Sequence, residues 1–324
     1  MILESLLIVA LALLLDFTLG DPKNKYHPTA WIGKLVAKLV PFTKNNSQKL
    51  EKLGGIVLVL IATSTVASFL VLLGITLENM PVPYYVGLFI TVVVGGVLLK
   101  TTIAIRGMER HAIAVLNALE RENLDEARTK LALIVKRDTK GLDKNHILSG
   151  VLESVSENTV DGVTGSLFYF ALFGLPGAFV YRTINTIDAM VGYKTSLFKN
   201  VGWFGANCDK VLNYIPARLT GLVMILSAMI LGENWKMSYQ IMRRDGKNTE
   251  SPNAGYPMAA LAGALGTRFE KIDHYSLGEG SLEFSKSHVK AAIKMMNLTS
   301  ILFCVIVTVQ IIVILSYLGW WIHV

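Results

Sequence analysis

The chain is 324 residues long, 52% of its residues are hydrophobic, and its formal net charge is +7. A mean hydropathy of +0.48 excludes a single soluble domain. The sequence has no basic patch with the signature of a nucleic-acid-binding fold, so we expect no nucleic-acid partner. The two cysteines, Cys208 and Cys304, provide neither a disulfide framework nor a metal site.

Long apolar segments predict an all-α polytopic integral membrane protein with about 4–6 transmembrane helices. The segments cover about 2–19, 53–77, 82–104, 163–181, 211–232 and 297–322, and a soluble helical insertion covers about 105–162. We treat 1–324 as a single membrane-embedded catalytic domain. The first segment lacks a basic n-region and a small-residue cleavage site, so we interpret it as a retained span.

The segment after the first span is rich in lysine. Its lysines are Lys23, Lys25, Lys34, Lys38, Lys44, Lys49 and Lys52, against the acidic residues Asp21 and Glu51. The positive-inside rule therefore places this segment in the cytoplasm and the N-terminus outside. Glycine pairs at 54–55 and 95–96 lie within apolar runs and indicate close helix contacts. A nucleotide would need an unusual site, because the sequence has no glycine-rich phosphate-binding motif.

Three carboxylates, those of Glu153, Glu157 and Asp161, recur at every fourth residue. On a helix they would lie along one face, where like charges repel one another. Bound Mg²⁺, which prefers oxygen ligands and is usually shared with phosphates, would relieve that repulsion. The alternative interpretation is a solvated acidic helix without a ligand.

An apolar segment follows the carboxylates and is broken at Gly174-Leu175-Pro176-Gly177. It is either a kinked helix that crosses the bilayer or a re-entrant hairpin, which is tolerated only when buried in protein. Beyond it Arg182, Asn185 and Asp188 recur at helical spacing. A hairpin would bring Asp188 to the same side as Glu157, and we expect both to serve one substrate.

Arginines near the span ends allow two interpretations each. Arg137 either pairs with Asp138 or binds a phosphate, and Arg218 either anchors a span end by snorkelling or recognises an anion. Carboxylates, arginines and Lys194 at span boundaries together indicate phosphoryl or acyl-phosphate chemistry on a membrane-held substrate.

The polar motifs stand in one order along most of the chain. They are Asp16-x-x-x-Gly20-Asp21-Pro22 with His27-Pro28, Glu153-x-x-x-Glu157-Asn158 with Asp161-Gly162, Leu175-Pro176-Gly177 with Arg182, Asn185-x-x-Asp188 with Tyr193-Lys194, Asn213-Tyr214-Ile215-Pro216-Ala217-Arg218, and Ser251-Pro252-Asn253-Ala254-Gly255-Tyr256-Pro257. In this order the chain resembles the CobD/CbiB family of cobalamin biosynthesis, the adenosylcobinamide-phosphate synthases.

The resemblance implies an ATP- and Mg²⁺-dependent carbon–nitrogen ligase. Such an enzyme joins adenosylcobyric acid to aminopropanol or aminopropanol O-phosphate and gives adenosylcobinamide or its phosphate. It also implies a multi-pass protein in the lipid bilayer of the inner (cytoplasmic) membrane, with its active site facing the cytoplasm. Such a protein could associate with other cobalamin-assembly membrane enzymes. Whether the amine carries a phosphate, and whether the activated acid is an acyl phosphate or an acyl adenylate, both stay open.

We assign the site residues by matching these motifs to their chemistry. Metal ligands are expected at Glu153, Glu157 and Asp161; catalytic groups at Asp188, Asp161, Arg182 and Lys194; and substrate-binding groups at Asp16, Asp21, His27, Asn158, Asn185, Tyr193, Arg218, Asn253 and Tyr256. For Asp16, Asp21 and His27 the alternative is a structural turn at the exit of the first span.

Two other classes compete with the ligase. A corrinoid-binding or transport protein could use intramembrane charges as a pathway, but the chain lacks the internal repeat of many transporters. A membrane phosphoalcohol transferase would need a D-x-x-D-G motif, which the sequence does not contain.

Overall fold

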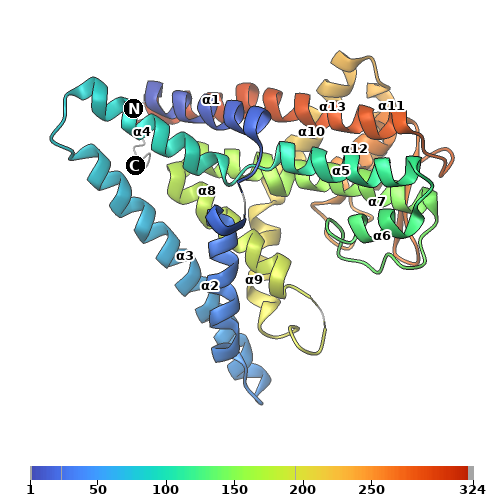
Figure 1. The fold of residues 1–324 in the computed structure, drawn as a ribbon, viewed down its shortest axis with the longest axis horizontal. Coiled ribbons are helices and arrows are strands. Elements are labelled where there is room, and N and C mark those ends of the chain that lie inside the picture. Colours follow the sequence, from blue (N-terminus) through green and yellow to red (C-terminus); the bar gives the residue numbers. More distant parts are fainter. Residues whose placement is uncertain (1, 23, 194, 320–324) are drawn as a thin grey trace. The chain divides into compact units, whose positions relative to one another are not determined.

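The computed structural model describes residues 2–22, 24–193 and 195–319 (Figure 1). These residues form helices and one two-stranded antiparallel sheet. They divide into two compact units. Unit 1 takes Met1–Ala104, Gly165–Leu212 and Cys304–Val324, and unit 2 takes Ile105–Thr164 and Asn213–Phe303. The second unit therefore begins where the soluble insertion was expected, and it also includes a later part of the chain.

Six helical stretches of the described chain are long and apolar enough to cross a membrane. They are Ile2–Leu19, Gln48–Glu78, Tyr84–Glu120, Lys144–Val191, Tyr214–Leu231 and Lys286–Tyr317. The predicted all-α polytopic membrane fold is confirmed.

Unit 1 contains most of the apolar helices. They are α1 (Ile2–Leu19), α2 (Pro28–Thr43), α3 (Gln48–Glu78), α4 (Tyr84–Lys100), α8 (Gly165–Val191), α9 (Gly202–Leu212) and α14 (Val309–Tyr317), with a 3₁₀ turn η1 (Asn24–Tyr26) and a π-helical turn η3 (Cys304–Thr308). Helices α1 and α4 lie side by side (Figure 1). A Cβ on Gly95 would lie 2.7 Å from Ile8 Cδ1, and one on Gly96 2.7 Å from Leu11 Cδ2, which confirms that glycines allow the close contact.

The lysine-rich segment is not a continuous loop, because α2 occupies its middle. His27 precedes the helix, and its Nδ1 accepts a hydrogen bond from the Thr29 backbone N–H at 3.2 Å. Pro28 then takes the first helical position, where its missing N–H is not needed. Capping and proline together explain why a helix begins here.

Helix α8 is a helical hairpin rather than one straight helix. The backbone leaves helical geometry at Phe173 and Gly174, where Gly174 has φ 62°. The rings of Tyr169 and Tyr181 stack with centroids 5.3 Å apart, and a Cβ on Gly165 would overlap the Tyr181 ring. In a straight helix Gly165 and Tyr181 would be roughly 24 Å apart. The chain therefore turns back at the break.

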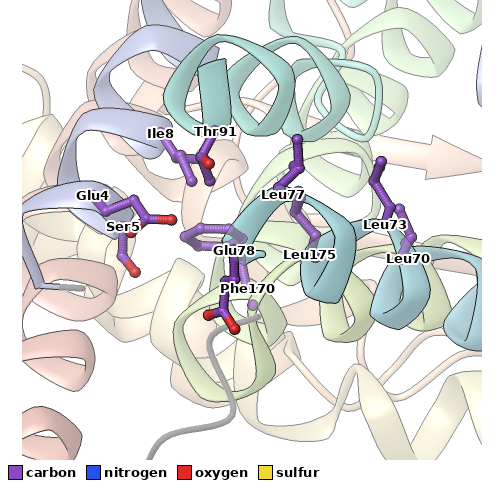
Figure 2. A pocket seen from close by; sticks show the side chains of 12 residues that line it. Glu4, Ser5, Ile8, Leu70, Leu73, Leu77, Glu78, Thr91, Phe170 and Leu175 are labelled. Atoms are coloured by element: carbon purple, nitrogen blue, oxygen red, sulfur yellow. The ribbon is translucent and has the colours of Figure 1, made fainter. Parts of the chain in front are cut away.

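The tip of the hairpin lies against the end of α3. Figure 2 shows Phe170 and Leu175 of α8 beside Leu77 and Glu78 of α3, around a cavity of about 30 Å³ that also reaches Glu4 of α1. That volume is enough for roughly one water molecule.

The two ends of the hairpin contact different parts of unit 1. Ser166, at the start, donates to the Thr102 carbonyl just beyond α4 at 3.1 Å. Val201, just after the hairpin, has its carbonyl against Gly55 near the start of α3. Thr29 at the start of α2 donates to the Thr101 carbonyl, whereas Thr43 at the end of α2 lies against Gly54. The two contacts therefore lie at opposite ends of α2. The hairpin folds back on itself, and most of its residues are buried or half-buried.

Unit 2 is a helical bundle with a small β-hairpin. It contains α5 (Ile105–Glu120), α6 (Leu124–Leu131), α7 (Lys144–Thr159), the π-helical turn η2 (Val160–Thr164), α10 (Tyr214–Leu231), α11 (Trp235–Asp245), α12 (Gly255–Leu265), β1 (Arg268–Lys271), β2 (Tyr275–Gly278) and α13 (Lys286–Phe303). Phe269 of β1 pairs with Leu277 of β2, and both side chains are fully buried. An isolated two-stranded hairpin is marginal, so this packing holds it to the bundle.

Candidate functional site

Glu153 of α7 lies at the centre of a buried network in unit 2. Its Oε1 accepts from Arg137 Nη2 at 3.0 Å and from Ser149 Oγ at 2.7 Å. Its Oε2 accepts from the Tyr275 hydroxyl of β2 at 2.7 Å. The Ser149 hydroxyl in turn accepts from the Glu270 backbone N–H at 2.9 Å. The network joins α7 to both strands of the β-hairpin.

The same network explains the titration of Tyr275. Burial raises the pKa of the Tyr275 hydroxyl, and the negative charges of Glu153 and Glu157 raise it further, so the group stays protonated and donates. Arg137 does not form the pair with Asp138 that its neighbourhood suggested. Its partner is Glu153, while Asp138 accepts from the Lys140 backbone N–H at 3.0 Å.

The expected three-carboxylate metal cluster is not assembled. Among the described residues, no group of three or more His, Cys, Asp and Glu side chains is placed to hold a metal ion. Both oxygens of Glu153 are taken by Arg137, Ser149 and Tyr275. Glu153 therefore does not fit the role of a metal ligand in this arrangement.

Glu157 and Asp161 differ from Glu153 in being half-buried. Asp161 falls within the π-helical turn η2, a feature frequent at functional sites. Asn158 uses its amide locally and donates to the Ser154 carbonyl at 2.9 Å. The metal and substrate roles of these three residues stay predictions.

Arg218 of α10 is held between two aromatic rings in unit 2. Its guanidinium carbon lies 3.5 Å from the centre of the Tyr214 ring and 4.4 Å from that of Tyr256. Nη1 donates to the Tyr214 carbonyl at 2.6 Å and to Asn253 Oδ1 at 3.2 Å. Three predicted substrate-binding residues, Arg218, Asn253 and Tyr256, therefore meet. Their two motifs lie far apart in the sequence.

This arrangement presents one edge of the guanidinium to a ligand. Within the described residues, Arg218 donates both of its hydrogen bonds from Nη1. The N–H groups of Nε and Nη2 are therefore available to a ligand. Such an edge matches a carboxylate or phosphate in two-point geometry. The two rings and the two hydrogen bonds hold the group in place. The anion-binding role of Arg218 stays a prediction.

A second polar cluster lies in unit 1, where the exit of α1 meets the end of α4. Lys100 Nζ lies 2.5 Å from Asp21 Oδ1 and 3.3 Å from Asp16 Oδ1, and Asp16 is fully buried. His27 Nε2 lies 3.7 Å from Asp21 Oδ1. Burial works to raise the pKa of Asp21, but hydrogen bonds from His27 and Lys100 outweigh it and lower that pKa.

Asp16 and Asp21 thus contact Lys100, a residue that the sequence motifs did not indicate, and His27 contacts Asp21. Lys100 ends an apolar span, where a basic residue is usually an interfacial anchor. The cap that His27 provides for α2 gives this residue a structural role as well.

A third group lies along the returning leg of α8. Arg182 Nη1 donates to Asn185 Oδ1 at 3.3 Å, and Asn185 Nδ2 donates to Asp209 Oδ1 of α9 at 3.4 Å. The Asp188 carbonyl accepts from the Gly192 N–H at 2.8 Å as the helix ends. Asp209 is a further polar residue of this group that the sequence motifs did not indicate.

The other predicted residues near the end of α8 are Tyr193, Lys194 and Asp188. Tyr193 is exposed just after the helix, and Lys194 lies outside the described residues. Asp188 and Glu157 belong to different units, so their action on one substrate stays a prediction.

The fold and these clusters define a polytopic helical membrane protein with carboxylates, amides and arginines gathered at helix ends. The family model described as CobD/CbiB protein matches residues 9–320. A probable cobalamin biosynthesis protein CobD of Methanothermobacter thermautotrophicus is 38% identical over 91% of this chain and 94% of its own length. A second, from Methanocaldococcus jannaschii, is 35% identical over 98% of both chains. No solved structure matches the chain.

The chain therefore belongs to the CobD/CbiB family, as its ordered motifs predicted. The cobalamin biosynthesis protein CobD of Leptospira interrogans is likewise 38% identical over 91% of this chain. The function of the protein lies in cobalamin biosynthesis.

Proposed function

We propose that the protein is an ATP- and Mg²⁺-dependent amide ligase that joins adenosylcobyric acid to aminopropanol or aminopropanol O-phosphate. The observation that supports it most directly is the stacked Arg218, which with Asn253 presents a fixed edge suited to a carboxylate or phosphate. Family membership supplies the corrinoid context. The product is adenosylcobinamide or its phosphate.

The chemistry requires activation of the corrinoid acid, because an unactivated carboxylate resists attack by an amine. A carboxylate oxygen attacks the γ-phosphorus of ATP, ADP leaves, and an acyl phosphate forms. Attack at the α-phosphorus would instead release pyrophosphate and form an acyl adenylate. The amine then attacks the acyl carbon, loses a proton, and expels phosphate or AMP as the amide forms.

Unit 2 supplies groups for the acid and the nucleotide. Arg218 binds the carboxylate or a phosphate through its Nε–Nη2 edge, and Tyr256 and Asn253 hold it in place. Glu157 and Asp161 are the carboxylates that would hold Mg²⁺, which would offset the negative charge of the ATP phosphates. Two carboxylates together with substrate phosphates are a common Mg²⁺ ligand set. Glu153 holds Arg137 and Tyr275 in place by accepting their hydrogen bonds.

Unit 1 supplies groups for the amine and the phosphate charge. Asp188 orients the amine or takes its proton, with Asn185 beside it on the same helix face. Arg182 and Lys194 carry positive charge for the phosphates. Asp16, Asp21, His27 and Tyr193 contact the corrinoid or the amine. We also propose that the protein lies in the inner membrane with this chemistry on the cytoplasmic side, where the basic segment 20–52 lies under the positive-inside rule.

A labelled corrinoid acid distinguishes the ligase from a transporter. The full chain, purified in detergent, is mixed with the radiolabelled acid, the amine and MgATP, and products are separated by chromatography. The proposal expects an amide product that requires ATP in detergent solution. Uptake into sealed vesicles without any amide product would instead support a corrinoid carrier.

A further inference from the structure

An ion pair with a buried carboxylate lies at the corner between α2 and α3. Lys44 follows the last residue of α2, and Glu51 lies in the first turn of α3 with 8% of its surface exposed. The Lys44 ammonium is 2.9 Å from Glu51 Oε1. Lys44 is partly exposed, with 30% of its side chain accessible, whereas Glu51 is buried.

Both members of the pair reach the segment 192–201, which connects α8 to α9. Asn200 Nδ2 donates to Glu51 Oε2 at 2.8 Å, so the two carboxylate oxygens are bound from different elements. Lys44 donates to the Leu197 carbonyl, and its ammonium lies 5.4 Å from the centre of the Phe198 ring. We call Lys44, Glu51 and Asn200 the corner clamp.

Backbone contacts show how closely the segment is held. A Cβ on Gly55 would overlap the Val201 carbonyl, and a Cβ on Gly202 would overlap the Val191 carbonyl. The start of α3 therefore touches the segment at its end, directly beyond the clamp. A small shift of the α2–α3 corner must move the segment as well.

The segment joins two elements that carry proposed site residues. Asp188 and Asn185 lie on the last turns of α8, and Tyr193 is the second residue after its end. Asp209 of α9 accepts the Asn185 amide. The clamp thus fixes the chain between Asp188 on one side and Asp209 on the other.

Stability alone does not call for an ion pair here. An apolar pair of similar volume would fill the corner as well, because solvent screening of the partly exposed Lys44 and desolvation of the buried Glu51 offset much of their attraction. An apolar pair could not bind the Asn200 amide or the Leu197 carbonyl. We propose that Glu51 and Lys44 are positioning residues that hold the 192–201 segment so that Asp188 and Tyr193 meet the substrate. This proposal rests on the ligase function proposed above.

The test compares K44M/E51M and N200A with the control K49Q in the full chain in lipid nanodiscs. Lys49 is exposed two residues before Glu51 on α3 and lies outside the clamp. The measurements are kcat, KM for each substrate, the thermal unfolding midpoint, and the rate of trypsin cleavage after the exposed Lys199.

The double variant is expected to unfold near the wild-type temperature, with kcat about 10- to 100-fold lower, as misplaced reacting groups produce. Cleavage after Lys199 becomes faster. N200A changes in the same direction and K49Q matches the wild type. A double variant with wild-type kcat, or with unchanged cleavage, overturns the proposal. Absence of ATP-dependent product from the wild type refutes the ligase function instead, so the two failures are distinguishable.

Discussion

Replacing Glu153 by Gln tests whether this carboxylate supports the fold or binds metal. The side chain is 5% exposed, and it accepts from Arg137, Ser149 and Tyr275. Glutamine keeps one oxygen acceptor and leaves the Arg137 guanidinium without a charged partner. Removing one member of a buried pair destabilises by roughly 3–5 kcal/mol. Because an acceptor survives, we expect about 3 kcal/mol.

Thermal unfolding of the detergent-solubilised protein measures this loss. A loss of 3 kcal/mol corresponds to a fall in midpoint of about 6–12 °C for a unit of this size. The matched variant R137M/E153M should recover much of the midpoint, since it removes both charges together. In parallel, E157Q should weaken the Mg²⁺ dependence of product formation with little change in unfolding.

One result would contradict the structural role of Glu153. An E153Q protein that unfolds like the wild type but has lost its response to Mg²⁺ would identify Glu153 as a metal ligand. The every-fourth-residue spacing of the carboxylates would then have been the better guide, and the contacts to Arg137 and Tyr275 would be secondary.

Three further predictions test other parts of the account. G165A should destabilise the α8 hairpin by about 1–3 kcal/mol through overpacking, whereas G141A, whose Cβ meets nothing within 4 Å, should leave the unfolding midpoint unchanged. R218K should raise KM for the corrinoid acid or for ATP roughly tenfold without changing the fold, because an ammonium lacks the planar two-point edge; an unchanged KM for both would remove Arg218 from the site. Burial favours a higher pKa for Asp245, but the bonds from Arg244 and a backbone N–H outweigh it and lower that pKa below its ordinary 3.8. The stability from this group is present above pH 3.8 and lost as the pH falls toward the lowered value, so D245N should flatten that acid limb of the unfolding profile.

The membrane spans could be predicted because apolar length and the absence of charge are properties of the sequence itself. The path of α8 could not. A glycine–proline break permits both a kinked crossing and a hairpin, and the choice depends on contacts between residues distant along the chain. The Tyr181 ring packs over Gly165, and Tyr169 stacks on it, which only the folded-back chain allows.

The candidate site shows the same division. Motif order indicated Arg218, Asn253 and Tyr256, and the structure brings them together. Spacing also put Glu153 with Glu157, but spacing does not reveal that a tyrosine more than a hundred residues later donates to Glu153.

Lys100 was missed for a related reason. At the end of an apolar span it looks like an anchor, and its two aspartate partners come from the exit of another helix.

The most direct test of the proposed ligase follows an oxygen atom. Adenosylcobyric acid labelled with ¹⁸O in its free carboxylate is converted with amine and MgATP, and the phosphorus-containing products are examined by mass spectrometry. Activation by ATP moves one carboxylate oxygen to phosphorus, so the account predicts ¹⁸O in inorganic phosphate, or in AMP if an adenylate forms. Amide product with no ¹⁸O in either would contradict ATP-driven ligation.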